Sequence, residues 1–354
     1  MKTTLPAQPA LEVDGKCGGL YNLRCIKTQW LRRDVLGMQL KEKIVRHLFL
    51  SALFILAATT DFSQSTISSQ PKLDRTQERL RVDVELVNVS CSVRDKKGKL
   101  VTDLNKENFR VYENNKVQEI TNFTRETDQA LAIAVLIDTS TSIRDKFKFE
   151  QEAAIDFFHT TIRRKKDKAL LLTFDSTIDL LQDFTDDPDQ LTKAVRALKP
   201  GGGTKMFDAI FQVCQEKMKG EIGSRKVLVL ISDGDDNLSL ESMESTLEIA
   251  QRTDVSIFAI STNSSAFFGM SSPKNDKILK SLADQTGGRA FFPPKAEDLA
   301  QSFQDISQEL RSQYSLAYRS TNSDRDGSFR AIKIDTDRKD LKVRARKGYY
   351  GPRG

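Results

Sequence analysis

The sequence predicts an α/β fold, in which a doubly wound and mostly parallel sheet is inserted in a small β-sandwich-like module. Between residues 130 and 311, short apolar runs alternate with stretches of helical periodicity, which is the pattern of strands covered by helices. On either side, residues 81–126 and 312–352 alternate apolar and polar side chains, which is the pattern of strands with one buried face. Neither flank holds enough strands for a stable sheet of its own, so we expect the two flanks to pair.

The central strands are predicted from continuous apolar runs, as expected of strands that are covered on both faces. The first helix turns Phe147, Phe157 and Phe158 toward the sheet, and the helix over 188–198 ends before Pro200. We expect strands at 131–137, 169–174, 178–181, 227–231, 255–260 and 290–292, and helices at 144–163, 188–198, 205–219, 241–252, 275–285 and 296–311.

The flanking segments contain turns between their expected strands. In the N-terminal flank, Gly98 lies in a charged turn and residues 114–115 (Asn-Asn) mark a second turn. In the C-terminal flank, residues 326–327 (Asp-Gly) lie between two alternating stretches. The strands expected from these patterns lie within 82–93, 109–112, 314–318, 329–334 and 341–345.

Residues 1–58 have the features of an export signal. The apolar run 48–58 ends on small residues, as in a signal peptide, and is preceded by Lys41, Lys43 and Arg46. As a helix, its eleven residues reach about half-way across a bilayer core, so we expect no stable membrane span once the signal is removed. The alternative is a buried core helix.

The segments next to this apolar run complete the prediction of export. Translation from Met38 would give the signal a short basic start, so we expect the residues before it to be either an artefact of gene calling or a dispensable extension. Residues 59–80 are rich in Ser and Thr and suit a flexible linker. The mature protein is therefore expected to be periplasmic or extracellular.

The distribution of charge excludes one large class of function. The chain carries +6, but residues 1–58 hold nine Lys or Arg against four acids, so the remainder carries only +1. Without a broad basic surface, the folded part lacks the electrostatic footprint of a nucleic-acid-binding protein. We therefore expect no nucleic-acid partner.

The histidines and cysteines exclude further kinds of site. His47 lies in the leader, which leaves His159 as the single imidazole of the mature chain. A histidine-based zinc site cannot be built within the chain from one imidazole, and a Ser-His-Asp or Cys-His centre would have to use His159. Cys91 and Cys214 are too few for a zinc module, and either form a disulfide after export or serve as small core residues.

Oxygen-bearing side chains follow the expected strands at the end of the sheet where ligands bind in such folds. Residues 138–142 (Asp-Thr-Ser-Thr-Ser) follow the first strand, 201–204 (Gly-Gly-Gly-Thr) open a helix, and 232–236 (Ser-Asp-Gly-Asp-Asp) follow the fourth strand. Asp, Ser and Thr oxygens without His or Cys suit a hard cation, Mg²⁺ or Ca²⁺, rather than zinc. With two carboxylates, Asp138 and Asp233, such a cation keeps an open position, for which an incoming carboxylate is the natural ligand.

Three sequence elements together resemble a von Willebrand factor type A domain with a metal-ion-dependent adhesion site: Asp-x-Ser-x-Ser at 138–142, Gly-Gly-Thr at 202–204 and Ser-Asp-Gly at 232–234. The resemblance covers about 130–311 and implies a Rossmann-like sheet. It implies Mg²⁺, with Ca²⁺ or Mn²⁺ as alternatives, and a protein partner whose Glu or Asp completes the metal shell. The implied ligands are the hydroxyls of Ser140, Ser142 and Thr204, with Asp138 and Asp233 acting directly or through water.

The flanking segments and residues 346–350 (Arg-Lys-Gly-Tyr-Tyr) also look similar to bacterial secreted proteins related to this family. This similarity concerns architecture more than function.

Several residues near the expected metal have two interpretations. Asp235 and Asp236 either add charge at the metal or form a solvated acidic loop, and Asp208 either orients a water near the metal or is a surface acid. The loop 262–273 lies on the same rim, and its apolar side chains either contact a partner or fold back onto the domain. These side chains are Phe267, Phe268 and Met270.

Two classes of function follow from this site. The first is a non-enzymatic, adhesion-type binding module that captures an acidic side chain of a partner protein through the cation. The second is a metal-dependent hydrolase that uses a cation-bound water, for which Asp235 or Asp236 is the nearby candidate base. Residues 201–203 lack the following Lys-[Ser/Thr] pair of a nucleotide-binding loop, so nucleotide hydrolysis is not expected. We favour the binding module, and the sequence gives no indication of the oligomeric state.

Overall fold

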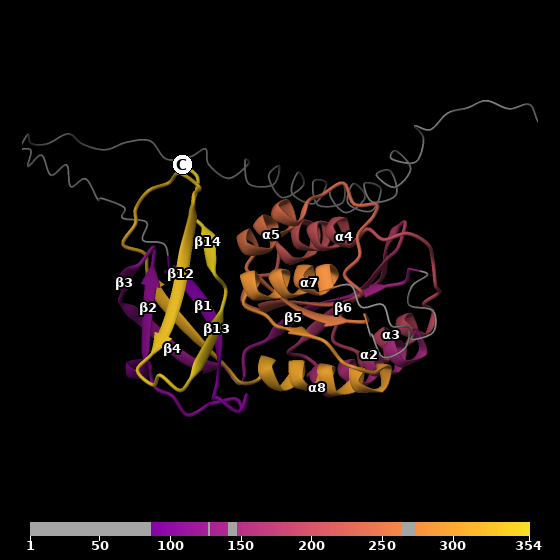
Figure 1. Cartoon of the computed structure of the whole chain (residues 1–354), viewed down its shortest axis with the longest axis horizontal. Helices are drawn as coiled ribbons and strands as arrows, with labels where there is room; N and C mark the ends of the chain where they lie inside the picture. The colour runs from indigo at the N-terminus through magenta and orange to yellow at the C-terminus, as the bar shows by residue number, and fades with distance from the viewer. Residues whose placement is uncertain (1–85, 127, 141–146, 264–272) are drawn as a thin grey trace, which may run out of the picture. The chain divides into compact units, whose positions relative to one another are not determined.

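Figure 1 shows the computed structural model of the chain, which describes residues 86–126, 128–140, 147–263 and 273–354. These residues belong to one compact unit. The expected leader, start codon and linker lie outside the described residues. Within the described ranges, no helix has both the length and the apolar composition that crossing a membrane requires.

A six-stranded sheet, in the order β10-β9-β8-β5-β6-β7, forms the centre of the fold. Five of its strands run parallel, while β7 lies antiparallel to β6 at one edge. All eight residues of β5 are buried, in agreement with its continuous apolar run. β7 was expected only over 178–181, but its pairing with β6 continues to Thr185. The strands are β5 (Leu131–Asp138), β6 (Lys168–Phe174), β7 (Ile178–Thr185), β8 (Arg225–Ser232), β9 (Val255–Ser261) and β10 (Ala290–Phe291).

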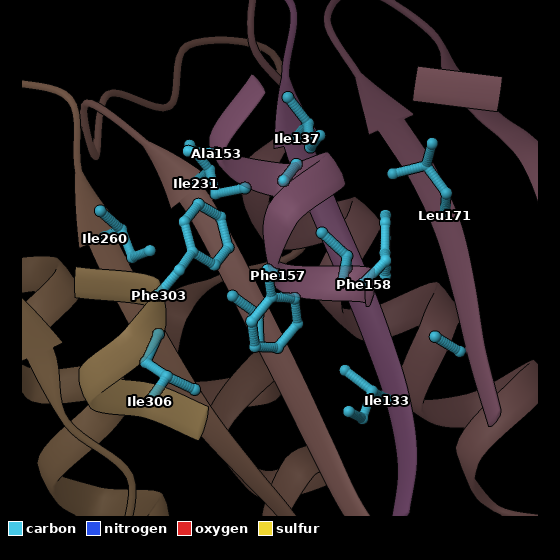
Figure 2. Packing of buried hydrophobic residues seen from close by; sticks show 14 of the residues in the cluster. Ile133, Ile137, Ala153, Phe157, Phe158, Leu171, Ile231, Ile260, Phe303 and Ile306 are labelled. Atoms are coloured by element: carbon cyan, nitrogen blue, oxygen red, sulfur yellow. The ribbon is translucent and has the colours of Figure 1, made fainter. Parts of the chain in front are cut away.

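Helices cover both faces of this sheet, which confirms the predicted doubly wound fold. α2, α3 and α8 pack on one face, and α4, α5 and α7 on the other (Figure 1). Figure 2 shows part of the first core, where Phe157 of α2 and Phe303 of α8 lie beside Ile231 of the sheet, with 5.0 Å between the two ring centroids. The helices are α2 (Phe147–Thr161), α3 (Pro188–Arg196), α4 (Met206–Val213), α5 (Met243–Arg252), α7 (Pro273–Thr286) and α8 (Leu299–Leu310).

Two helices differ from their sequence prediction in the type of turn they contain. The helix expected over 205–219 is α-helical only as α4 and continues as a π-helical turn, η3 (Cys214–Met218). The helix expected over 296–311 begins with a 3₁₀ turn, η4 (Ala296–Asp298), before α8. Apolar periodicity predicts that a helix is present but does not distinguish these tighter and wider turns.

The flanking segments form two antiparallel four-stranded sheets, β13-β1-β11-β4 and β14-β12-β2-β3. Each sheet combines strands from both flanks, since β1 pairs with β11 and β13, and β12 pairs with β2. Alternate residues, among them Val89, Val111 and Leu316, share one core, so the predicted β-sandwich-like module is confirmed. The strands are β1 (Leu86–Arg94), β2 (Phe109–Glu113), β3 (Lys116–Gln118), β4 (Ile120–Glu126), β11 (Gln313–Arg319), β12 (Phe329–Thr336), β13 (Lys342–Ala345) and β14 (Gly348–Tyr350).

A buried acid joins this module to the last helix of the central domain. Glu309 of α8 is fully buried and accepts hydrogen bonds from the Ser92 hydroxyl and the Arg94 guanidinium, both at 2.7 Å. Because a buried carboxylate has lost its water, its ionised form depends on such donors. β1 thereby holds the end of α8.

The two described cysteines are core residues. Cys91 and Cys214 are both buried and neither is in a disulfide; they lie in the separate cores of the β module and of the α4 face of the sheet. The disulfide considered from the sequence is therefore absent from the described structure. Burial raises the pKa of the Cys214 thiol to about 12, which keeps it protonated and unreactive.

Candidate metal centre

Three loops meet at the carboxyl end of the central sheet. β5 ends at Asp138 and β8 ends at Ser232, and the Ser232 hydroxyl donates a 2.8 Å hydrogen bond to the Asp138 carboxylate. The N–H of Thr139 donates to the Phe174 carbonyl at 3.0 Å, and the Thr139 carbonyl accepts the N–H of Gly201 at 2.6 Å. The loop after β5 therefore contacts both the loop after β8 and the glycine-rich loop before α4.

Asp138 is the buried acid of this centre, with 0% of its surface exposed. One carboxylate oxygen accepts the backbone N–H of Ser140 at 2.9 Å, and the other accepts the Ser232 hydroxyl. Burial raises the pKa of Asp138 to about 6 and the charge of Asp233 adds to the rise, whereas the hydrogen bonds from Ser140 and Ser232 oppose it. A cation beside this carboxyl group would favour its ionised form.

The loop after β8 presents Asp233 by means of a tight turn. The Ser232 hydroxyl accepts the N–H of Gly234 at 3.0 Å, and the Asp233 carboxylate accepts the N–H of Asp235 at 3.0 Å. Gly234 has a φ of +76°, and a Cβ at this position would lie 2.8 Å from the carbonyl oxygen of Asn275 in α7. Only glycine combines this φ with this close approach of the helix, which explains the Ser-Asp-Gly order.

Thr204 is held by the same loop. Its backbone N–H donates to the Asn237 side chain at 3.0 Å, and its carbonyl accepts the N–H groups of Asn237 at 3.2 Å and Leu238 at 3.0 Å. Thr204 is almost fully buried. The backbone N–H and carbonyl of Thr204 thus fix the glycine-rich loop before α4 to the loop after β8.

Two acids near the expected metal, Asp236 and Asp208, fix this loop to α4. The Asp236 carboxylate accepts the N–H of Phe207 at 2.9 Å, which satisfies a free donor in the first turn of α4. The Asp208 carboxylate accepts the N–H groups of Leu240 at 2.9 Å and Glu241 at 2.8 Å. Asp235 remains exposed on the loop.

Four of the five predicted ligands lie within the described residues. Asp138 and Ser140 are in direct contact. The loop after β8, which Ser232 joins to Asp138, carries Asp233 and holds Thr204. The remaining predicted residues lie outside the described residues: Ser142, Phe267, Phe268 and Met270.

The chemistry of the described donors fits a hard cation. The centre offers carboxylate and hydroxyl oxygens, and its buried carboxyl group has a raised pKa, which a bound cation would lower. Among the described residues, no three His, Cys, Asp or Glu side chains cluster as metal ligands. A site of two carboxylates with hydroxyls requires no such cluster.

The comparison with protein families agrees with this geometry. The sequence profile of the von Willebrand factor type A domain matches residues 132–307. Residues 132–307 form a von Willebrand factor type A domain. This range contains every described residue of the candidate metal centre and the whole six-stranded sheet except Leu131, the first residue of β5. No curated protein matches the chain.

Solved structures resemble the type A domain at low sequence identity. Proximal thread matrix protein 1 from the mussel byssus is 16% identical, with a TM-score of 0.46 over 56% of this chain and 51% of that chain. An aerotolerance-related membrane protein from Bacteroides fragilis NCTC 9343, with multiple mutations to serines, is 13% identical, with a TM-score of 0.42 over 51% of this chain and 98% of that chain. The chain thus spans about half the length of the mussel protein. At these identities the likeness concerns the fold alone.

Sequence reasoning missed residues that hold the loops of the candidate metal centre together. Ser232 was noted only as part of the Ser-Asp-Gly element, although its hydroxyl bonds to both Asp138 and Gly234. Asn237, which holds Thr204, stands out in the sequence only as part of an Asn-x-Ser sequon and was not connected with the site, because its partner lies 33 residues away in the chain. Position directly after a buried strand was the available signal for Ser232, and no local signal marks Asn237.

Proposed function

We propose that this protein is an exported, non-enzymatic binding protein that captures a partner protein through a divalent cation in its type A domain. The observation that supports this most is the contact of three loops around one buried carboxylate, Asp138, beside a second acid, Asp233. We propose the following metal ligands: Asp138, Ser140, Ser142, Thr204 and Asp233. A Glu or Asp of the partner would complete the shell.

Mg²⁺ is the cation we propose, with Ca²⁺ or Mn²⁺ as alternatives. Hydroxyl and carboxylate oxygens are hard ligands, and they prefer Mg²⁺, Ca²⁺ and Mn²⁺ over softer ions. Proximal thread matrix protein 1 has also been solved with a zinc-occupied site of this kind, at 16% identity and a TM-score of 0.46. Zinc therefore belongs in any panel of cations tested on this protein.

The proposal of binding rather than hydrolysis is supported by how the nearby acids are used. A hydrolase of this type needs a general base near the metal, and Asp236 was one of two candidates. Its carboxylate accepts the N–H groups of Phe207 and Ser239 and the Ser239 hydroxyl, and is thus committed to the loop. Asp235 remains as the candidate base of that alternative.

Export is part of the same proposal and rests on the sequence. We propose that residues 1–58 are a signal segment, with translation starting at Met38, and that 59–80 are a linker. The module of 81–126 and 312–352 would then carry the type A domain, proposed over 130–311, in the periplasm or outside the cell. Mass spectrometry of the N-terminus of the mature protein tests this part.

The function is tested by comparing the chain with its Asp138→Ala variant in Mg²⁺ and in EDTA. Mg²⁺ at a hundred times its Kd stabilises a binding-competent protein by about 2.7 kcal/mol, so we expect a rise in Tm of several degrees in the wild type alone. Immobilised chain should retain proteins from envelope and secreted fractions in Mg²⁺ and release them in EDTA. Retention of the same proteins by Asp138→Ala would contradict the proposal.

A further inference from the structure

Two exposed leucines lie on the loop that holds the candidate metal ligand Thr204. Leu240 is 94% exposed and Leu238 is 44% exposed, only a few residues beyond Asp233. Single exposed apolar residues are common on protein surfaces, and Ile222, 91% exposed at the opposite end of β8, is an ordinary example. The leucines differ from Ile222 because they lie two positions apart on the loop that holds Thr204, a proposed metal ligand.

Hydrogen bonds hold the backbone of both leucines in place. The N–H of Leu238 donates to the Thr204 carbonyl at 3.0 Å, and the N–H of Leu240 donates to the Asp208 carboxylate at 2.9 Å. Between them, the N–H of Ser239 donates to the Asp236 carboxylate at 3.1 Å. Because this backbone is fixed before any partner arrives, little conformational entropy is lost when the leucines are covered.

The glycine-rich loop packs against Leu238 at one glycine and is open at the preceding one. A Cβ on Gly203 would lie 2.3 Å from a Leu238 methyl carbon, so this leucine lies directly on the Gly203 backbone. A Cβ on Gly202 would meet no atom of the described residues within 4 Å. Among the residues that the structure describes, no side chain fills the space above Gly202, two positions before Thr204 in the chain.

We propose that Gly202, Leu238 and Leu240 form an apolar step that receives an apolar side chain of the partner, next to the acidic residue that binds the metal. This inference rests on the proposed function and names the kind of partner: a protein segment in which Leu, Ile, Val, Met or Phe lies within a few positions of one Asp or Glu.

The charges around the apolar step favour such a segment over a polyanion. Asp235 and Glu241 lie on the same loop, on either side of the leucines, and Asp233 precedes them. A polyanionic chain would place like charges against these acids and would leave both leucines in water. A segment with one acid and an apolar neighbour covers the leucines and adds a single negative charge, at the metal.

A library of random twelve-residue peptides displayed on phage tests this, panned on the full chain in Mg²⁺ and eluted with EDTA. We expect the eluted peptides to share an acid with an apolar neighbour. For the best synthetic peptide, Leu238→Ser/Leu240→Ser should raise Kd about tenfold or more, and Gly202→Val should do the same by filling the open space. Ile222→Ser is the matched control and should leave Kd unchanged.

A double-mutant cycle separates direct contact from an effect on folding. Replacing the peptide's apolar residue by Ser should weaken binding about tenfold in the wild type, but little in Leu238→Ser/Leu240→Ser. The Mg²⁺-induced rise in Tm should be the same in Leu240→Ser as in the wild type, because this residue is 94% exposed. Leu240→Ser alone, at a position almost wholly in solvent, gives a second variant that cannot disturb the core.

The failures of the two proposals are distinguishable. EDTA-eluted peptides without an apolar neighbour, or equal Kd values for the wild type and the double leucine variant, would overturn the apolar step and leave metal-dependent capture intact. Finding no peptide whose binding needs both Mg²⁺ and Asp138 would overturn the proposed function together with the step.

Discussion

The hydroxyl of Ser232 donates to the Asp138 carboxylate at 2.8 Å and accepts the N–H of Gly234 at 3.0 Å, so one buried side chain joins the ends of two neighbouring strands. Ser261 makes the equivalent two hydrogen bonds one strand further along the sheet, but its carboxylate partner lies in α7. It ends β9, donates to the Asp276 carboxylate at 3.0 Å and accepts the N–H of Asn263 at 3.2 Å. The two serines have the same chemistry and nearly the same burial, but only Ser232 contacts a proposed metal ligand.

Ser232→Ala and Ser261→Ala therefore form a matched pair. Each variant loses one hydrogen bond to a carboxylate and leaves a loop N–H without its acceptor, so we expect each to lose about 1–3 kcal/mol of unfolding free energy. Ser232→Ala should also weaken Mg²⁺ binding severalfold, because Asp138 is no longer held in place. Calorimetric titration with Mg²⁺ and chemical denaturation measure the two effects. Equal Mg²⁺ affinity in both variants would show that Ser232 has no part in the metal centre.

Asp138→Asn should have opposite effects in EDTA and in Mg²⁺. Burial raises the pKa of Asp138 from 3.8 to about 6, so above pH 6 the folded protein holds an ionised carboxylate at an energetic cost that the unfolded chain does not have. We expect the variant in EDTA at pH 7.5 to be as stable as the wild type or more so, by up to about 3 kcal/mol. In Mg²⁺ the order should reverse, since the variant gains nothing from the cation. Thermal unfolding in the two buffers provides the measurement.

The fold was predictable from the sequence because its strands are apolar on both faces or alternate strictly. The continuous apolar run of β5 and the alternation of apolar and polar residues in β1 and β12 each predict a strand. The π-helical turn η3 and the full length of β7 were missed, since both depend on pairing and packing rather than on local composition. Predicting these features requires the neighbours that the fold brings together.

Only part of the candidate site could be predicted from the sequence. Asp138 and Asp233 stand directly after apolar strands, and the position of parallel strand ends in such a sheet makes them neighbours. The roles of Asp236 and Asp208 were not predictable, because each acid bonds to backbone groups about 30 residues away in the chain. The sequence does not show whether a carboxylate near a metal motif accepts hydrogen bonds from backbone N–H groups.

Asp235→Ala tests the hydrolase alternative more cleanly than a change at Asp236. Asp235 is exposed, so its removal should leave the unfolding free energy within about 0.5 kcal/mol of the wild type and should not change partner capture. Asp236→Ala removes the acceptor for the Phe207 N–H at the start of α4 and should cost about 1–2 kcal/mol. If a purified preparation hydrolyses a substrate in Mg²⁺ and Asp235→Ala abolishes the turnover while Mg²⁺ binding persists, the non-enzymatic assignment is wrong.

Asp167 should govern part of the acid stability. Burial alone would raise its pKa, but hydrogen bonds from Arg163 at 2.8 Å and Arg311 at 2.5 Å, with the N–H of Leu131, outweigh burial and lower the pKa to about 2. A lowered pKa in the folded state stabilises the protein above about pH 4, and this stability is lost as the pH falls through 2. The gain at neutral pH is roughly 2 kcal/mol.

Asp167→Asn should therefore lower the unfolding free energy at pH 7 by about that amount and flatten its decline between pH 4 and 2. Asp128 also pairs with Arg163, and Lys166 lowers its pKa, but it is exposed and its charge is screened by water. Asp128→Asn is therefore the matched control and should change the acid limb far less than Asp167→Asn. Denaturation midpoints measured every half pH unit compare the three proteins. An unchanged acid limb in Asp167→Asn would mean that other carboxylates set the acid stability.

The contact of Arg94 with Glu309 predicts a non-additive pair of substitutions. Arg94→Met leaves the fully buried Glu309 carboxylate with Ser92 at 2.7 Å and a more distant Arg289 at 3.8 Å, so we expect a loss of about 3 kcal/mol. Glu309→Gln should cost less, because the amide keeps an acceptor and carries no charge. Combining Arg94→Met with Glu309→Leu should restore part of the stability lost in Arg94→Met alone, since no unpaired charge remains in the core. Urea unfolding of the wild type, Arg94→Met, Glu309→Leu and the double variant measures the coupling. If the double variant loses more unfolding free energy than the two single variants lose in total, apolar side chains cannot replace this ion pair.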